Sequence, residues 1–263
     1  MNNLSLKNNK LEEYYIFSTC RWSILNHPKM NLVKKLKDMH SYHYSIQGNN
    51  IFTQPVNYTV KLTDIVDSIL YHKGLYDTSL IKHPDFKRMF FIFKEAKFIE
   101  PNTHPLLDNT PIIYSKCILE IWSIDEYLFK DGPFKDKNLP FKIKSCHRVY
   151  DSELFNTREL SENEALEKIK LIKKLVNCPI LIVGPYLSLT QPTIVNDKRK
   201  KTQKILKNIC KLENLKYFDM THEIEKDNTI LISAPGRESH ETHFTEKGQK
   251  IINEVVYNFF KNE

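Results

Sequence analysis

Residues Ser161–Val183 read SENEALEKIKLIKKLVNCPILIV and combine the two patterns that alternate along this chain. Ser161 and Glu164 have the spacing of a capping box, in which two side chains bind the free N–H groups at the start of a helix. The apolar residues that follow recur at helical spacing, at Ala165, Ile169, Ile172 and Val176. Ile180–Val183 is then continuously apolar. The stretch therefore predicts a helix followed by a strand.

The same alternation extends over the rest of the chain. Further strands are predicted at Tyr14–Ser18, Tyr42–Ile46, Met89–Phe93, Ile112–Ile121, Lys216–Asp219 and Thr229–Ser233. Further helices are predicted at Leu62–His72, Asp197–Leu212 and Thr245–Phe260. Such an alternation forms a mostly parallel sheet with helices on both faces. We therefore expect a three-layer α/β/α sandwich, with functional sites at the carboxyl ends of its strands.

Length and composition indicate one large domain. A chain of 263 residues, of which 41% are apolar, can bury one sizeable core. Residues 1–12 are mostly polar and predict a disordered tail before a domain at 13–263. Loop insertions are expected near 98–110 and 130–148, where prolines interrupt the pattern. No apolar run reaches the ~18 residues that span a bilayer and no signal peptide is evident, so we expect a cytoplasmic protein.

Charge and cysteine content narrow the possible partners. The five cysteines are widely spaced without a Cys-x-x-Cys pair, which indicates reduced thiols rather than disulfides or a zinc site. The net charge of +7 suits an anionic ligand such as a phosphate, coenzyme A or nucleic acid, but many soluble lysine-rich proteins share it. The chain carries no nucleic-acid-binding motif, so such binding is not expected.

Cys20 follows the first predicted strand and is the first candidate for a nucleophile. A thiol must ionise to attack, and a cation such as Arg21 or a helix N-terminus lowers its pKa. Backbone N–H groups in the turn after a strand can also bind an oxyanion. Cys146, beside His147, is the second choice. The alternative for Cys20 is a buried structural thiol.

His243 lies just before the last predicted helix and is the candidate general base. Thr245 is a predicted N-cap whose hydroxyl accepts the N–H of Gly248, which would fix the loop that carries His243. A histidine held in this way suits proton transfer, whereas the alternative is a surface histidine. With His240 and Glu241, the segment superficially resembles a zinc-protease motif. That motif needs histidines four apart on a helix, so no metal site is predicted.

A basic run follows the predicted N-cap Asp197. Lys198, Arg199, Lys200 and Lys201 would place four cations at a helix N-terminus, against the macrodipole. A bound anion, such as a coenzyme A phosphate, would explain them. The alternative is a solvated helix face with Asp197 compensating.

Two single residues are weaker candidates. The side chain of Asn57 can donate to an oxyanion, or Asn57 is a turn residue beside Pro55. Glu120 is unusual in an apolar strand, and it either faces a site or pairs with a basic residue.

Six short segments share the order of one known family: Ser18–Trp22, Gln54–Thr59, Leu119–Trp122, Arg158–Glu164, Ile180–Pro185 and His243–Thr245. Through them the chain resembles the GSCFA family and, more broadly, the SGNH (GDSL-like) hydrolase superfamily, from Tyr14 to Phe260. The segment at Cys20 is similar to the Gly-Ser-Cys-Phe-Ala motif of that family. It is also similar to the Gly-Asn-Cys opening of capsular-polysaccharide proteins that are linked to coenzyme A.

The resemblance implies an acyltransferase or esterase that acts on a carbohydrate or another hydroxyl-bearing substrate. Cys20 would attack the acyl carbonyl, His243 would take and return the proton, and Glu241 would orient His243. The implied oxyanion- or substrate-binding residues are Arg21, Asn57, Glu120 and His240. No cofactor is required, although a coenzyme A thioester would serve as an acyl donor.

Two departures from the superfamily pattern keep a second interpretation open. Ser18 stands where the superfamily has its opening glycine, and His240 stands where it has the acid that orients the base. Cys20 and His243 could then act as a dyad, because a thiol ionises more readily than a serine hydroxyl. The alternative is a catalytically degenerate hydrolase fold that binds a glycan or an anionic partner.

Overall fold

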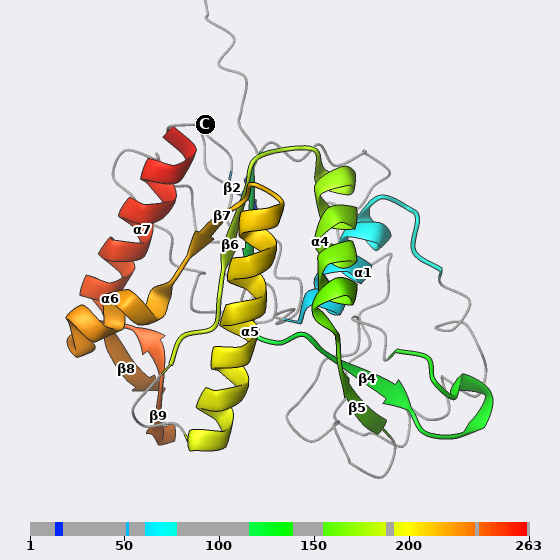
Figure 1. Ribbon diagram of the computed structural model, residues 1–263. Helices are drawn as coiled ribbons and strands as arrows, with labels where there is room; N and C mark the ends of the chain where they lie inside the picture. Colours follow the sequence, from blue (N-terminus) through cyan, green and yellow to red (C-terminus); the bar gives the residue numbers. More distant parts are fainter. Residues whose placement is uncertain are drawn as a thin grey trace, which may run out of the picture.

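The computed structural model describes residues 14–17, 51–52, 61–77, 116–138, 155–187, 192–234 and 237–261. The elements up to β6 are β1 (Tyr14–Phe17), β2 (Ile51–Phe52), α1 (Leu62–His72), β3 (Lys116–Glu120), β4 (Asp125–Phe129), η3 (Gly132–Phe134), β5 (Phe155–Glu159), α4 (Glu162–Val176) and β6 (Ile180–Val183). Those after it are α5 (Thr193–Leu212), β7 (Lys216–Phe218), α6 (Met220–Lys226), η4 (Asn228–Ile230), β8 (Leu231–Ala234), β9 (Arg237–Phe244) and α7 (Glu246–Lys261). Figure 1 shows their arrangement.

A parallel sheet forms the centre of this α/β protein. Its strand order is β2-β1-β3-β6-β7, and every neighbouring pair is parallel. The chain therefore moves outward from β1 in both directions, first to β2 and then to β3. Phe17 at the end of β1 pairs with Leu119, and Glu120 at the end of β3 pairs with Val183. In such sheets, ligands bind outside the carboxyl ends of the two strands at which the order reverses, here β1 and β3.

Apolar side chains cover both faces of β3 and β6. Leu119 and Ile182 pack in one buried cluster with residues of α1, α4 and α5, among them Ile65, Ile169 and Leu206. Their neighbours along the strands, Ile118 and Leu181, pack in a second cluster with residues of α6, η4 and α7, namely Met220, Ile230 and Ile252. Alternate strand residues point to opposite faces, so both of these strands are buried on two sides.

Two of the three predicted helix caps are confirmed. Ser161 N donates to Glu164 Oε2 at 2.8 Å and Glu164 N donates to Ser161 Oγ at 3.3 Å, which completes the capping box of α4. At the start of α7, Gly248 N donates to Thr245 Oγ1 at 3.3 Å. Each of these bonds satisfies an N–H that lacks a partner within the helix.

Helix α5 begins earlier than the sequence predicts. It starts at Thr193, so Asp197 lies inside the helix and the predicted N-cap is wrong. The carbonyl of Pro192 accepts the N–H groups of Val195 and Asn196, at 3.0 and 3.2 Å. The helix is therefore already formed when the chain reaches Asp197.

Two antiparallel hairpins, β4–β5 and β8–β9, were not predicted from the sequence. β4 and β5 pair antiparallel as a separate two-stranded sheet. The predicted insertion from residue 130 begins with the turn at η3, and residues 139–148 lie outside the described residues. The segment before α7, predicted as a loop, is strand β9, which pairs with β8. The expected tail at 1–12, the insertion at 98–110 and the predicted strands at 42–46 and 89–93 also lie outside the described residues.

Candidate functional site

The segments that leave β3, β6 and β7 meet at the carboxyl edge of the sheet. Trp122 lies two residues after the end of β3. The chain continues from β6 through Gly184–Leu187, and Asp219 directly follows β7. This edge is where parallel sheets bind ligands. Two features are built there, an aromatic cluster and a cavity.

The aromatic cluster consists of Trp122, Tyr186 and Phe244, together with Arg199. The Trp122 and Tyr186 rings meet edge to face with centroids 5.0 Å apart, and the Phe244 ring lies 6.2 Å from that of Tyr186. The Arg199 guanidinium lies 4.5 Å from the centre of the Trp122 ring, and its Nη1 donates to the Tyr186 carbonyl at 3.1 Å. Such stacking is favourable because a ring face is electronegative. The cluster thus joins β3, β6, α5 and β9.

Glu120 lies below this cluster, at the end of β3. Its side chain is only 2% exposed, and its Oε1 accepts the indole N–H of Trp122 at 2.7 Å. A buried carboxylate needs such donors to offset its lost hydration. Glu120 was predicted either to face a site or to pair with a basic residue. The structure shows that one of its partners is Trp122, an aromatic residue at the carboxyl edge of the sheet.

Three side chains of α5 hold the exits of β6 and β7. Arg199, Gln203 and Lys207 are spaced four apart and so lie on one face of the helix. Gln203 Nε2 donates to the Pro185 carbonyl at 2.7 Å, and Lys207 Nζ forms an ion pair with Asp219. This face of α5 thereby fixes the backbone of the carboxyl edge.

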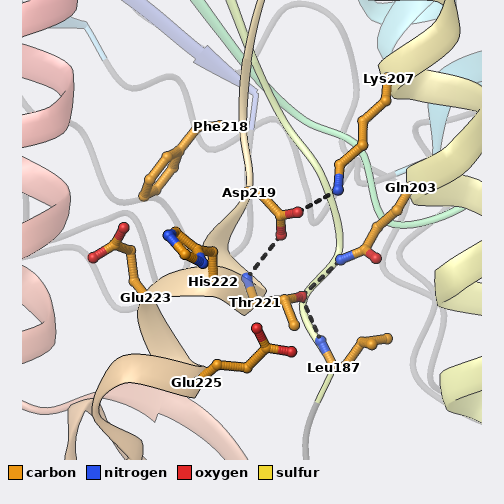
Figure 2. A pocket seen from close by; sticks show the side chains of 9 residues that line it. All are labelled: Leu187, Gln203, Lys207, Phe218, Asp219, Thr221, His222, Glu223 and Glu225. Carbon is orange, nitrogen blue, oxygen red and sulfur yellow. Dashed lines mark hydrogen bonds and ion pairs between the residues drawn. The ribbon is translucent and has the colours of Figure 1, made fainter.

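A cavity of about 520 Å³ opens between α5, α6 and the ends of β6 and β7. Its walls are formed by Leu187, Gln203, Lys207, Phe218, Asp219, Thr221, His222, Glu223 and Glu225 (Figure 2). Three of these residues are carboxylates, of which Asp219 pairs with Lys207 and Glu223 with Lys226, so that Glu225 gives the cavity its negative balance. Its volume falls in the range of small-molecule sites.

Tyr217 packs directly over the backbone of β6 beside the cavity. A Cβ at Gly184 would lie 1.8 Å from Tyr217 Oη, so only glycine fits there. The Tyr217 hydroxyl is itself buried, has no hydrogen-bond partner in the described part of the chain, and has a pKa raised by that burial. The Tyr217 ring can therefore pack against this backbone because residue 184 has no Cβ.

The structure brings only part of the predicted site together. Cys20, Arg21, Asn57 and Cys146 lie outside the described residues. For His240, Glu241 and His243 the structure describes the backbone, which belongs to β9: Glu241 pairs with Ser233 and His243 with Ile232.

The predicted anion site at the start of α5 is wrong in its geometry. Lys198, Arg199 and Lys200 lie beyond the first turn, where the free N–H groups of the helix are no longer available. Lys198 and Lys200 are exposed, and Lys200 lies 3.7 Å from Asp197. Arg199 instead stacks on the aromatic cluster.

The three described cysteines are not suited to nucleophilic attack. Burial raises the pKa of Cys178 and of Cys210 to about 12, and that of Cys117 well above its usual value. A thiol must ionise to react, so these thiols stay inert near neutral pH.

Several edge residues were not predicted from the sequence, among them Tyr186, Gln203 and Thr221. Tyr186 could have been suspected because it follows a strand and a Gly-Pro pair. Gln203 and Thr221 carry no local signal, since their roles depend on the pairing of β6 with β7.

The chain matches no protein-family model and none of the curated proteins.

The described residues include no group of three histidine, cysteine or acidic side chains that could hold a metal. None of the described helices has the length and apolar character needed to cross a bilayer.

Proposed function

We propose that this chain is an acyl-transfer enzyme, an acyltransferase or an esterase, that acts on a carbohydrate or another hydroxyl-bearing substrate. Cys20 is the nucleophile and His243 is the base. The supporting observation is the contact of Phe244 with Tyr186 at the carboxyl edge of a sheet whose order puts β1 beside β3. The proposal assigns the two ends of the chain that carry the candidate residues to this one edge.

The nucleophile end is constrained by chain connectivity. Cys20 follows Phe17, the last residue of β1, by three positions, and three residues span at most about 11 Å. Since Phe17 pairs with Leu119, the proposal requires the chain after β1 to turn toward Glu120, the next residue of β3.

The base end is held by buried contacts. Phe244 is 6% exposed and adjoins His243 in β9. The next residue, Thr245, donates its N–H to the Ile230 carbonyl at 2.9 Å and its hydroxyl to the Thr229 carbonyl at 3.0 Å. These bonds fix the backbone that carries the histidine, as a general base requires.

The fold supports the same proposal. Apolar clusters on both faces of β3 and β6 lead us to infer the three-layer α/β/α sandwich of the SGNH superfamily. In that interpretation the GSCFA-like opening at Cys20 lies at the reversal of strand order, where a site is expected.

The proposed reaction proceeds in two steps. His243 takes the thiol proton as Cys20 sulfur attacks the acyl carbonyl, and the tetrahedral intermediate expels the donor's oxygen or sulfur, which receives that proton. The acceptor hydroxyl, or water, then loses its proton to His243, attacks the thioester and regenerates the Cys20 thiol. Backbone N–H groups after β1 and the Asn57 side chain stabilise the oxyanion, and Glu241 orients His243.

The test is the intact mass of the protein after incubation with acetyl-coenzyme A or p-nitrophenyl acetate. We expect a mass increase of one acetyl group in the wild type, none in Cys20→Ala, and an unchanged result in Cys178→Ala, whose half-buried thiol is the matched control. Cys146→Ala tests the second-choice thiol. An adduct that persists in Cys20→Ala would refute the assignment. The absence of any adduct would favour the non-catalytic, glycan-binding alternative.

A further inference from the structure

Two buried polar side chains at the cavity keep hydrogen-bonding capacity for which the described residues provide no partner. Thr221 and Gln203 are each 7% exposed and both line the cavity. Buried polar groups normally find partners, so capacity that is left over beside a cavity points to a ligand.

The hydroxyl oxygen of Thr221 already accepts two hydrogen bonds. Thr221 Oγ1 accepts Gln203 Nε2 at 2.7 Å and the N–H of Leu187 at 3.1 Å, as Figure 2 shows. A hydroxyl has two lone pairs and one hydrogen. Within the part of the chain that the structure describes, that hydrogen has no acceptor.

The amide of Gln203 donates both of its hydrogens, so its oxygen is the group without a partner among the described residues. Its Nε2 donates to Thr221 Oγ1 and to the Pro185 carbonyl. Because a carbonyl only accepts, the nitrogen must face Pro185 and the amide cannot be turned over. Gln203 Oε1 is thus left as an acceptor, with no donor among the described residues.

An unused donor next to an unused acceptor matches a ligand hydroxyl, which both accepts and donates. We propose that the cavity between α5 and α6 binds a sugar ring, either neutral or bearing an amine. One ring hydroxyl would accept from Thr221 and donate to Gln203 Oε1. Leu187 and Phe218 provide an apolar wall for the ring, and the carboxylate of Glu225 accepts from a further hydroxyl or an ammonium group. Glu223 Oε1 already accepts from Lys226, which leaves its Oε2 for a second contact.

The charge of the cavity sets its specificity. Lys207 is paired with Asp219, and Lys226 is paired with Glu223 at 3.0 Å, so the exposed Glu225 alone gives the remaining wall a negative balance. An acidic sugar would meet this like charge and bind more weakly. The inference rests on the proposed function only for the role of the sugar, which would be the acyl acceptor.

The experiment measures binding and needs no turnover. D-glucose, D-glucosamine and D-glucuronate are titrated into full-length Cys20→Ala protein and followed by saturation-transfer NMR. We expect glucose and glucosamine to bind and glucuronate to bind about two- to threefold more weakly than glucose. Loss of one hydrogen bond in Thr221→Val should weaken binding about tenfold, whereas Thr221→Ser should retain it.

A second variant tests the charge without disturbing the buried bonds. Glu225 is exposed, and Glu225→Gln should lower the ratio of glucosamine to glucose affinity about two- to threefold. Glu167→Gln on α4 is the matched control and should change nothing. The inference is overturned if neither neutral nor amino sugar binds, if glucuronate binds equally well, or if Thr221→Val binds like the wild type. Failure of the acylation test alone would leave these results unaffected.

Discussion

The buried polar groups around Glu126 and those around Thr221 differ in how fully the protein satisfies them. Glu126, on β4, is 6% exposed, and its carboxylate accepts Thr63 Oγ1 at 3.1 Å and the Nε of Arg158 at 3.2 Å, with Lys168 Nζ at 3.3 Å. Although burial acts to raise it, these partners hold the pKa of Glu126 below its usual value. Around Thr221, by contrast, the Thr221 hydroxyl hydrogen and Gln203 Oε1 have no partner among the described residues.

This difference separates a structural network from a candidate binding site. The Glu126 network joins α1, β4, β5 and α4 with donors on both carboxylate oxygens, so it has little left to offer a ligand. The groups around Thr221 fix the exits of β6 and β7 and still present hydrogen-bonding capacity to a cavity. Full satisfaction indicates a role in stability, and partial satisfaction at a cavity indicates recognition.

The largest expected effect is at Gly184, which positions the backbone on the cavity side. In Gly184→Ala the new Cβ overlaps the Tyr217 hydroxyl, and we expect the free energy of unfolding to fall by about 3 kcal/mol. Urea unfolding followed by circular dichroism measures it. Adding Tyr217→Phe should recover part of the loss. Gly74→Ala, where φ is +70° and no atom lies within 4 Å of the new Cβ, is the control and should cost only about 1 kcal/mol. Equal costs at the two glycines would contradict the close approach.

Removing the centre of the Glu126 network is expected to have the next largest effect. Glu126→Ala leaves Thr63, Arg158 and Lys168 without their shared carboxylate, and we expect a loss of about 2–3 kcal/mol in the free energy of unfolding. Glu167→Ala breaks only an exposed pair with Lys170 on α4 and should cost no more than about 0.5 kcal/mol. A cost at Glu126 as small as that at Glu167 would mean that the network is not structural.

The contrast also explains what could be predicted from the sequence. The α4 helix and its cap were predictable because Ser161 and Glu164 interact within one turn. The same holds for Thr245 and Gly248 at α7. The sheet itself followed from the alternation of elements, but not the pairing of β1 with β3.

Contacts between distant residues are the part that escaped prediction. Hairpin β4–β5 was missed because its stabilising pair, Glu126 and Arg158, joins polar strands that lack a clear apolar pattern. The cavity was missed because Gln203 and Thr221 meet only once β6 and β7 are paired. The start of α5 was placed too late because a backbone carbonyl, at Pro192, forms the first bonds instead of a side chain.

A smaller effect, with a distinct pH dependence, is expected at Asp67 on α1, beside the Glu126 network. Burial is the main cause that raises the pKa of Asp67 to about 7, and the negative charge of Asp64 adds to it, although Lys168 acts in the opposite direction. Burial also raises the pKa of Asp64, to about 6. A carboxyl whose pKa is higher in the folded state holds its proton longer there, so stability falls as the pH rises from about 4 to 7.

Asp67→Asn removes the charge that causes this loss. We expect the variant to exceed the wild type by about 2 kcal/mol at pH 8 and to match it at pH 4. Urea unfolding at both pH values measures the difference. Asp77→Asn, at an exposed position after α1, is the control and should not reduce the pH dependence. An Asp67→Asn variant that is less stable at pH 8 would show that the carboxylate is satisfied like Glu126.

The smallest expected effect separates the structural bonds of Thr221 from its unused one. Thr221→Val keeps the shape but removes the acceptor for Leu187 N and Gln203 Nε2, and we expect a loss of about 1 kcal/mol in stability. The loss is modest because Gln203 keeps its bond to the Pro185 carbonyl. Thr221→Ser should be close to wild type. If Thr221→Val lost as much stability as Glu126→Ala, Thr221 would be a structural centre, and its free hydrogen would carry less weight as a sign of ligand binding.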